Sequence, residues 1–236
     1  MKGKIIVITG IDACGKETQT NYLFDYLKSQ NIPVVKQSFP NYASESSGPL
    51  NMYLGCKLSE TAEEIDAYQA SSLFIADFLC TAKSQKFEEL LEKGYVILMD
   101  RYTEGNAIHQ AIKIPEPEKR KEFIEWLNDF QYSKLKIPKP DAVLCLNLPF
   151  KTCLNLMSQR KELKNGQKQD IHEKDVKHLA AAYAQCQALR KSEGWTNIIC
   201  SDKNGNLESR EAIHAKIVNE VQKILQPVKQ QGPEMQ

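Results

Sequence analysis

The chain has 236 residues, of which 42% are hydrophobic and 26% are charged, as in ordinary soluble globular proteins. Its 31 Lys and Arg side chains nearly balance 30 Asp and Glu, so the overall charge gives no attraction for nucleic acid or for anionic lipid. The length suits one large α/β domain. We expect a single domain over residues 1–227 and a frayed polar tail over 228–236.

The amino terminus and the cysteines indicate the cellular compartment of the protein. The first eight residues hold only five apolar side chains, too few for a signal-peptide core or for a membrane span. Seven cysteines are scattered along the chain without a CxxC pair, and this odd number and spacing fit neither a disulfide nor a zinc framework. We therefore expect reduced thiols, a cytoplasmic protein and no structural zinc.

Apolar runs and helical patterns alternate along the chain. Short continuous apolar runs are typical of parallel strands that are covered on both faces. The predicted strands are 4–10, 32–40, 94–100, 140–149 and 195–202, of which the second and the last have the weaker pattern. The predicted helices are 16–30, 66–94, 116–135, 173–194 and 209–225. This alternation predicts an α/β fold, with a central parallel sheet of about five strands and helices on both faces.

Polar residues follow three of the predicted strands. Gly10–Thr18 follow the first strand, Phe39–Tyr42 end the second, and Asp100–Tyr102 end the third. Because ligands of such sheets bind outside the carboxyl ends of the strands, we expect these three segments to converge on one binding site.

The segment Gly10-Ile-Asp-Ala-Cys-Gly15-Lys16 lies directly between the first strand and the first helix. Its G-x-x-x-x-G-K spacing is typical of a phosphate-binding loop, in which backbone N–H groups surround phosphate oxygens at the positive end of a helix. We expect Lys16 to reach the β- and γ-phosphates of ATP. The predicted ATP-binding residues are Gly10, Ile11, Asp12, Ala13, Cys14, Gly15, Lys16, Glu17 and Thr18.

Glu17 departs from this loop pattern, because Ser or Thr at that position normally gives Mg²⁺ a neutral hydroxyl ligand. A carboxylate is also a hard oxygen ligand, but it adds negative charge beside a triphosphate. Three alternatives stay open: Glu17 binds the metal or its water shell, Thr18 takes over this role, or catalysis is lost.

Further motifs follow the loop in order: FPNY (39–42), MDRYTEGNAIHQ (99–110), KPDAVLCLNLP (139–149) and DIHEKD (170–175). With them the chain resembles the thymidylate kinases over nearly all of residues 3–225, and DRY is the most family-specific element. The resemblance implies a P-loop kinase fold with a short flexible lid. It also implies ATP-dependent phosphorylation of dTMP to dTDP, with Mg²⁺ accompanying ATP, and a homodimer formed through the long helix predicted at 66–94.

The resemblance also assigns catalytic roles. Asp12 and Asp100 match acids that hold Mg²⁺ near the reacting phosphates, and Glu17 is a further candidate ligand. Arg101 matches the residue that bridges the donor and acceptor phosphoryl groups, where a fixed guanidinium suits the charge that develops during transfer. The predicted catalytic residues are Lys16, Asp100, Arg101 and Arg160.

The polar and basic stretch 158–175 is the predicted lid. Arg160 is the candidate arginine that closes over the transferred phosphate, and Lys161, Lys164 and Lys168 are alternatives. A solvated charged loop is the simpler interpretation of such a stretch, because runs of charge usually form exposed faces.

The residues that the resemblance places around dTMP differ in chemistry. Phe74 matches the ring on which thymine stacks, Tyr42 matches a hydroxyl near the acceptor phosphate, and Asn106 matches the amide that reads the pyrimidine edge. His109 stands where the family often has Tyr or Phe beside the sugar. The predicted dTMP-binding residues are Phe39, Tyr42, Phe74, Arg101, Asn106, His109 and Tyr183.

Two departures from the family pattern keep other functions open. Phe78 stands where thymidylate kinases usually have a substrate-contacting Arg, and Gly105 stands where a Ser is usual. Lys83 is a candidate replacement for the missing guanidinium. One alternative is therefore a P-loop kinase for another nucleoside monophosphate. The alternative of another class, which Glu17 motivates, is a catalytically silent nucleotide-binding regulatory protein.

Overall fold

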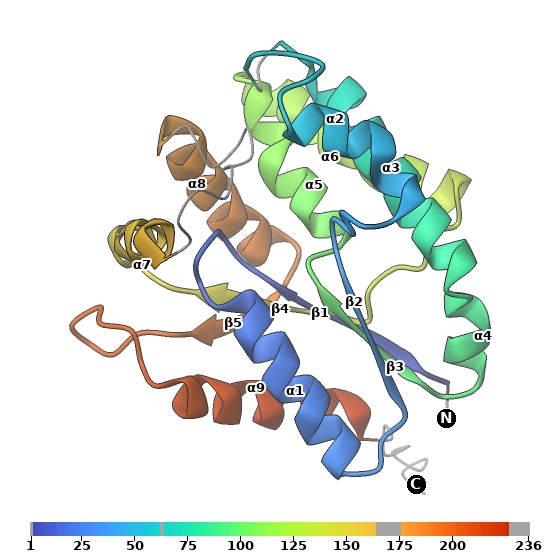
Figure 1. Cartoon of the computed structure of the whole chain (residues 1–236), viewed down its shortest axis with the longest axis vertical. Helices are drawn as coiled ribbons and strands as arrows, with labels where there is room; N and C mark the ends of the chain where they lie inside the picture. The colour runs from blue at the N-terminus through green and yellow to red at the C-terminus, as the bar shows by residue number, and fades with distance from the viewer. Residues whose placement is uncertain (1, 62–63, 164–175, 227–236) are drawn as a thin grey trace, which may run out of the picture.

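The computed structural model describes residues 2–61, 64–163 and 176–226, with the side chains of 160–163 excepted. Its centre is a five-stranded sheet in the order β2-β3-β1-β4-β5, and every pair of neighbouring strands is parallel. The strands are β1 (Lys4–Thr9), β2 (Val34–Ser38), β3 (Val96–Asp100), β4 (Ala142–Asn147) and β5 (Thr196–Ile199). The predicted α/β fold with a parallel sheet is therefore confirmed (Figure 1).

Helices cover both faces of this sheet. In Figure 1, α1 and α9 lie on one face, and α3, α5, α6 and α8 lie on the other. The α-helices of the described residues are α1 (Lys16–Ser29), α2 (Gly48–Leu54), α3 (Ala67–Ser84), α4 (Phe87–Glu92), α5 (Thr103–His109), α6 (Pro117–Asn128), α7 (Phe150–Leu163), α8 (Val176–Ser192) and α9 (Arg210–Leu225). The 3₁₀ turns η1 (Glu45–Ser47) and η2 (Ala111–Lys113) and the π-helical segment η3 (Asp129–Lys134) complete them.

The central strand β1 determines where the site forms. It pairs with β3 on one side and β4 on the other, and its register places Ile8 opposite Asp100. Because both strands end at this level, the loop after β1 and the residues after β3 emerge side by side. The predicted convergence of Gly10–Thr18 with Asp100–Tyr102 follows from this register.

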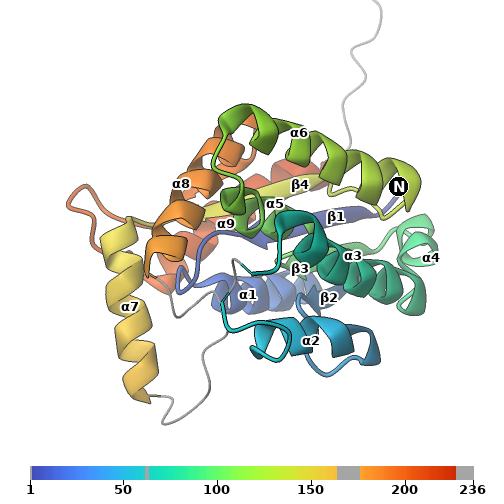
Figure 2. The ribbon, with the colours of Figure 1, turned by 90° about the horizontal axis from the view of Figure 1, so that it is seen from above.

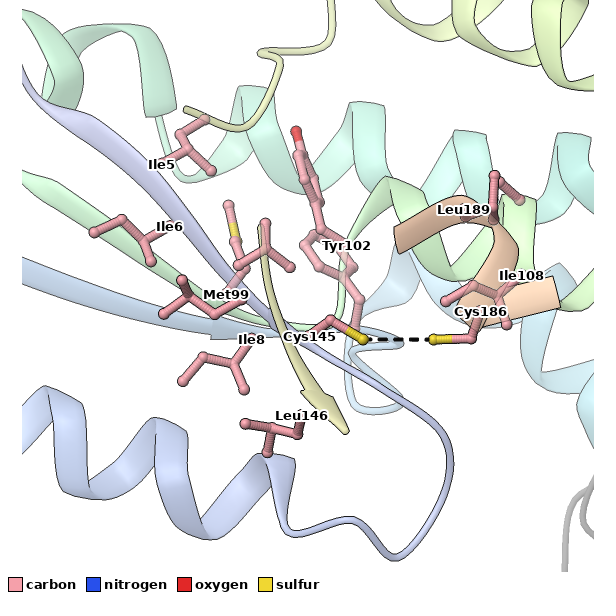
Figure 3. Packing of buried hydrophobic residues seen from close by; sticks show 14 of the residues in the cluster. Ile5, Ile6, Ile8, Met99, Tyr102, Ile108, Cys145, Leu146, Cys186 and Leu189 are labelled. Atoms are coloured by element: carbon pink, nitrogen blue, oxygen red, sulfur yellow. Dashed lines mark hydrogen bonds between the residues drawn. The ribbon is translucent and has the colours of Figure 1, made fainter. Parts of the chain in front are cut away.

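The core is continuous on both faces of the sheet. Ile5, Ile6 and Ile8 of β1 are fully buried, as a strand covered by helices on both sides requires. Figure 3 shows the packing of β1 and β4 against α8, where Cys145 Sγ lies 3.7 Å from Cys186 Sγ. All seven cysteines are free thiols, as the sequence predicts.

Two predicted helices differ from the structure. The helix predicted over 66–94 is divided into α3 and α4, because the chain turns at Lys86, which has a left-handed backbone (φ 55°). The helix predicted over 116–135 becomes π-helical after Asn128. The sequence pattern did not predict the short helices α2 and α5 or the helix α7.

The start of α3 is well defined by its first residues. Asp66 Oδ1 accepts the backbone N–H of Gln69 at 2.8 Å, and Gln69 Oε1 accepts the backbone N–H of Asp66 at 3.1 Å. This reciprocal capping box satisfies two N–H groups that the first turn would leave unpaired. None of the described helices is long and apolar enough to cross a membrane.

The packing of α1 on the sheet gives a stability prediction. Leu27 is fully buried, so Leu27→Ala should lower the free energy of unfolding by about 2–5 kcal/mol, through lost contacts and the cavity left behind. Urea denaturation measures this change. Asp25→Ala, on the exposed face of the same helix, is the control and should change stability by less than about 0.5 kcal/mol. Equal effects of the two substitutions would contradict the packing described.

Candidate active site

A cavity of ≈770 Å³ opens at the carboxyl ends of β1, β2 and β3. Its volume lies within the range of small-molecule sites in proteins. Thirteen of the predicted site residues line it: Asp12, Ala13, Gly15, Lys16, Glu17, Thr18, Phe39, Tyr42, Phe74, Asp100, Arg101, Asn106 and His109. The three converging segments that the sequence predicts therefore form one cavity.

The phosphate loop has the backbone that its glycines permit. Gly10 has φ 139° and Gly15 has φ 92°, conformations that residues with a side chain rarely adopt. A Cβ on Gly10 would lie 2.8 Å from the carbonyl oxygen of Leu146, so the loop can pass β4 only with glycine there. Ile11 and Cys14 are buried in the core, and neither they nor Gly10 line the cavity.

Lys16 is held inside the loop. Its side chain is buried, and Nζ donates a hydrogen bond to the carbonyl oxygen of Ile11 at 2.6 Å and lies 3.8 Å from Asp12 Oδ1. The ammonium is thus already positioned at the wall of the cavity, where a phosphate group would meet it.

Asp12 and Arg101 form a short ion pair across the cavity floor. Burial alone would raise the pKa of Asp12, but the nearby Arg101 and Lys16 charges outweigh it and hold this pKa well below its usual range. Burial would lower the pKa of Arg101, whereas Asp12 and Asp100 raise it above its usual value. Asp12 therefore stays ionised and Arg101 stays protonated at every physiological pH.

The backbone at Arg101 is unusual. Arg101 has φ 60°, in the left-handed region that residues other than glycine seldom occupy. The next residue, Tyr102, is buried; its hydroxyl donates to the carbonyl oxygen of Pro138 at 3.0 Å and its backbone N–H donates to Glu104 Oε1 at 3.1 Å. Strained backbone of this kind clusters at functional sites, and here it directs the guanidinium toward Asp12.

Asp100 and Glu17 are the carboxylates that remain for a cation. Asp100 Oδ1 is buried and has no hydrogen-bond partner in the described ranges. Burial raises the pKa of Asp100, while Lys16 and Arg101 oppose this effect. Glu17 lines the same cavity with an exposed side chain, and its charge is felt at Asp100. The donor set fits Mg²⁺, which takes one or two carboxylates together with phosphate oxygens.

An aromatic cluster of Phe39, Phe74, Phe78 and Tyr102 forms one wall of the cavity. Phe39 meets Phe78 edge to face at a centroid distance of 4.9 Å, and Phe74 and Tyr102 lie 6.5 and 5.5 Å from Phe78. Phe78 is almost fully buried, so apolar packing occupies the position where the family usually has Arg. Lys83 does not supply a replacement, because its Nζ pairs with Glu88 at 2.9 Å and it does not line the cavity.

His109 also lines the cavity. Its ring stacks on that of His178, with centroids 5.8 Å apart and planes 11° from parallel. Burial lowers the pKa of His109 to about 3, although the Asp12 charge opposes this shift. His109 is therefore a neutral side chain at physiological pH.

Two of the predicted site residues, Tyr183 and Arg160, are not among the described residues that line the cavity. Tyr183 on α8 does not line the cavity; its ring lies 5.5 Å from that of Phe150. The first part of the predicted lid, residues 158–163, is the end of helix α7, which includes Arg160. The side chain of Arg160 and residues 164–175 lie outside what the structure describes.

Sequence reasoning missed several residues of the site. Asp77 is fully buried, and its Oδ1 accepts hydrogen bonds from Ser46 Oγ at 2.6 Å and from Ser47 Oγ at 2.9 Å. These bonds hold the segment after Tyr42 against α3. Leu54 and Leu156 line the cavity from the unpredicted helices α2 and α7. No local pattern marks these long-range contacts.

Comparisons with known proteins agree with this geometry. A family model described as thymidylate kinase matches residues 8–213. Thymidylate kinase from Brachyspira hyodysenteriae is 31% identical over 163 residues, which cover 68% of this chain and 71% of that protein. Thymidylate kinase from Plasmodium falciparum is 27% identical over 225 residues, covering 94% of this chain and 91% of its relative.

A solved structure shares the fold. Thymidylate kinase from Candida albicans superposes with a TM-score of 0.66 at 20% sequence identity, covering 94% of this chain and 92% of the other. This likeness concerns the arrangement of strands and helices.

The buried imidazole of His109 predicts a dependence of stability on pH. The unfolded chain binds a proton at this histidine near pH 6.5, whereas the folded state binds it only near pH 3. The free energy of unfolding should therefore fall as the pH falls through this window. His109→Gln should reduce the loss between pH 7 and pH 5 by up to about 2 kcal/mol.

Urea denaturation at several pH values measures this loss. His214→Gln is the control, because His214 on α9 is only half-buried and should change the pH dependence less. An unchanged pH dependence in His109→Gln would show that His109 is not the buried neutral base described.

Proposed function

This chain belongs to the thymidylate kinase family, and from that membership we propose that it transfers the γ-phosphoryl group of ATP to dTMP, giving dTDP. The observation that carries the proposal is the single cavity in which the phosphate loop, Arg101 and the aromatic wall meet. It offers a phosphate-binding end and a base-binding end, as a transfer between two nucleotides needs.

The positions of the side chains suggest how each substrate binds. Backbone N–H groups of the loop and Lys16 would hold the phosphates of ATP. Phe74 would stack on the thymine ring, with Asn106 at its edge and Tyr42 near the acceptor phosphate. Arg101 lines the same cavity beside Asp12 and would stabilise the charge of the transferred group by bidentate hydrogen bonds. Positioning and charge stabilisation are the main contributions to such transfers.

Asp100 and Glu17 are the proposed carboxylates for Mg²⁺, with Asp12 close by. The orphaned Oδ1 of Asp100 and the exposed carboxylate of Glu17 support this assignment. Bound Mg²⁺ would neutralise charge on the β- and γ-phosphate oxygens. Asp12 serves mainly to orient Arg101, because its carboxylate is already paired with that guanidinium.

Phe78 affects which nucleoside monophosphate the protein accepts. With a buried phenyl ring in place of a guanidinium, this wall makes apolar contacts and lacks a charged donor. The wall can therefore pack on a nucleobase ring, but it does not select among the polar substituents of that ring. A silent nucleotide-binding role is less favoured, because Lys16, Asp100 and Arg101 line one cavity together.

We propose further that the protein is a cytoplasmic homodimer and that Arg160 acts from the lid. The dimer proposal rests on α3, whose exposed face carries small side chains at Ser72, Ala76 and Cys80. These residues follow one another at a spacing of four, so they form one stripe along the helix. Such a stripe lets the same helix of a second copy approach closely.

The kinase proposal is tested by ADP release from Mg²⁺-ATP with a panel of nucleoside monophosphates. Turnover should be highest with dTMP, and Lys16→Ala should lower it at least about 100-fold, because the phosphates lose a positioned charge. Lys28→Ala, on the exposed face of the same helix, is the control and should match the unmodified protein.

Other outcomes of the panel separate the alternatives. Highest turnover with another monophosphate would keep the kinase and overturn the substrate. ATP binding without turnover on any acceptor would support the silent role, and Glu17→Ser would then show whether this carboxylate is the cause.

The dimer proposal predicts a loss of association in Ala76→Glu. A carboxylate at this point would be buried against its own symmetry mate, and like charges in close contact repel. Light scattering during size-exclusion chromatography measures the molar mass. Ala215→Glu places the same change on the exposed face of α9 and should leave the dimer intact. A monomeric unmodified protein would refute the proposal directly.

A further inference from the structure

A second cavity of ≈360 Å³ lies behind the active site. It reaches the amino ends of β4 and β5 at Ala142 and Thr196, whereas the active-site cavity opens at carboxyl ends. The short helix α5 separates the two: Thr103, Glu104 and Ala107 face the second cavity, and residues 105, 106 and 109 face the first. Figure 2 shows α5 among α6, α8 and β4, which are some of the elements that line this second cavity.

Two buried acceptors in this cavity lack hydrogen-bond donors. Glu104 is 6% exposed and Gln131 is 2% exposed. Within the described part of the chain, no hydrogen bond reaches Glu104 Oε2 or Gln131 Oε1. A buried acceptor without a donor destabilises the folded protein, so a ligand that donates hydrogen bonds to these two oxygens would be stabilised by them.

For Glu104, burial disfavours the charged carboxylate form. Its Oε1 accepts the backbone N–H of Tyr102 at 3.1 Å. Burial nevertheless raises the pKa of Glu104, although backbone N–H groups and the Thr9 side chain favour the charged form. A cation beside Oε2 would stabilise the ionised carboxylate that burial disfavours.

The π-helical segment η3 supplies part of the cavity wall. Gln131 and Tyr132 both belong to it, and the Tyr132 hydroxyl lies 2.5 Å from Thr103 Oγ1. π-Helical turns are rare and occur frequently at functional sites. Here the wider turn places an amide and a phenol on the same cavity, which the indole of Trp195 also lines.

The charges that line the cavity are mostly negative. Glu104, Asp141 and Glu193 line it, against Lys139, whose Nζ lies 5.6 Å from the Tyr132 ring centroid. Asp141 is partly neutralised by Lys4 at 2.8 Å. The rings of Tyr132 and Trp195 add faces that attract a cation.

We propose that this cavity is a second ligand-binding site, which takes a small flat cation with several N–H donors, of the amidinium or guanidinium class. The fork of donors would pair with Glu104 Oε2 and Gln131 Oε1, and the flat body would lie between Tyr132 and Trp195. The site is distinct from the phosphate loop, and the proposal holds whichever monophosphate the protein phosphorylates.

The test uses ¹⁹F NMR of the full chain labelled with 5-fluorotryptophan. The protein has two tryptophans: Trp195 lines the cavity, whereas Trp126 packs on Tyr68 at 4.6 Å and does not line it. Titration with benzamidine should shift the Trp195 resonance in a saturable manner and leave that of Trp126 in place. Trp195→Phe and Trp126→Phe assign the two resonances.

Matched probes and variants decide the outcome. Benzoate has the same shape with the opposite charge and should not shift Trp195. Glu104→Gln should weaken benzamidine binding about tenfold or more, and Gln131→Leu should weaken it by a smaller factor. Thermal melts show whether each variant is folded. If Glu104→Gln does not fold, the binding test is made with Gln131→Leu.

Three results would overturn the proposal. They are an unshifted Trp195 at saturating benzamidine concentrations, an equal response to benzoate, and unchanged benzamidine affinity in folded variants. Because the readout is binding and not turnover, it can fail or succeed independently of the kinase assay.

Discussion

The ion pair between Asp12 and Arg101 joins the two segments on which the site is built. Asp12 comes from the loop after β1 and Arg101 from the end of β3, and the register of these strands brings them together. Their side chains are 13% and 26% exposed, so removing either partner would leave a charge with little solvent to stabilise it. The pair therefore holds the loop, the strand end and the unusual backbone of Arg101 in one arrangement.

The same interaction means that the cationic groups already have partners before a nucleotide arrives. Arg101 is paired with Asp12, and Lys16 donates to a carbonyl oxygen of its own loop. Guanidinium and ammonium groups each carry several N–H donors, so Arg101 and Lys16 can bind phosphate oxygens while they keep these partners and without large side-chain rearrangement. Preorganisation of this kind reduces the entropy lost on binding and favours rapid, well-aligned transfer.

Much of this architecture could be predicted from local sequence. Continuous apolar runs identified the strands, because burial on both faces removes alternation, and glycine spacing identified the loop. The break at Lys86 was missed, since neither glycine nor proline marks it. Helix α5 was hidden because seven residues are too few to show helical periodicity.

The contacts that could not be predicted are those between distant segments. Asp77 holds Ser46 and Ser47 from a helix about thirty residues further along the chain. The aromatic wall combines Phe39, which follows β2, Phe78 of α3 and Tyr102, which precedes α5. The resemblance to thymidylate kinases supplied the roles of several such residues. It also predicted Tyr183 beside dTMP, but the ring of Tyr183 packs on that of Phe150 and does not line the cavity.

Helix α5 has a consequence for how this protein can diverge from its relatives. Its seven residues present one side to each of two cavities. Inserting or deleting a residue would rotate part of the helix and would therefore change the residues that line both cavities. Point substitutions on one side remain free, but the length of the helix is shared. Lineages can therefore change one lining by substitution alone, and natural variation in this segment should be confined to replacements at constant length.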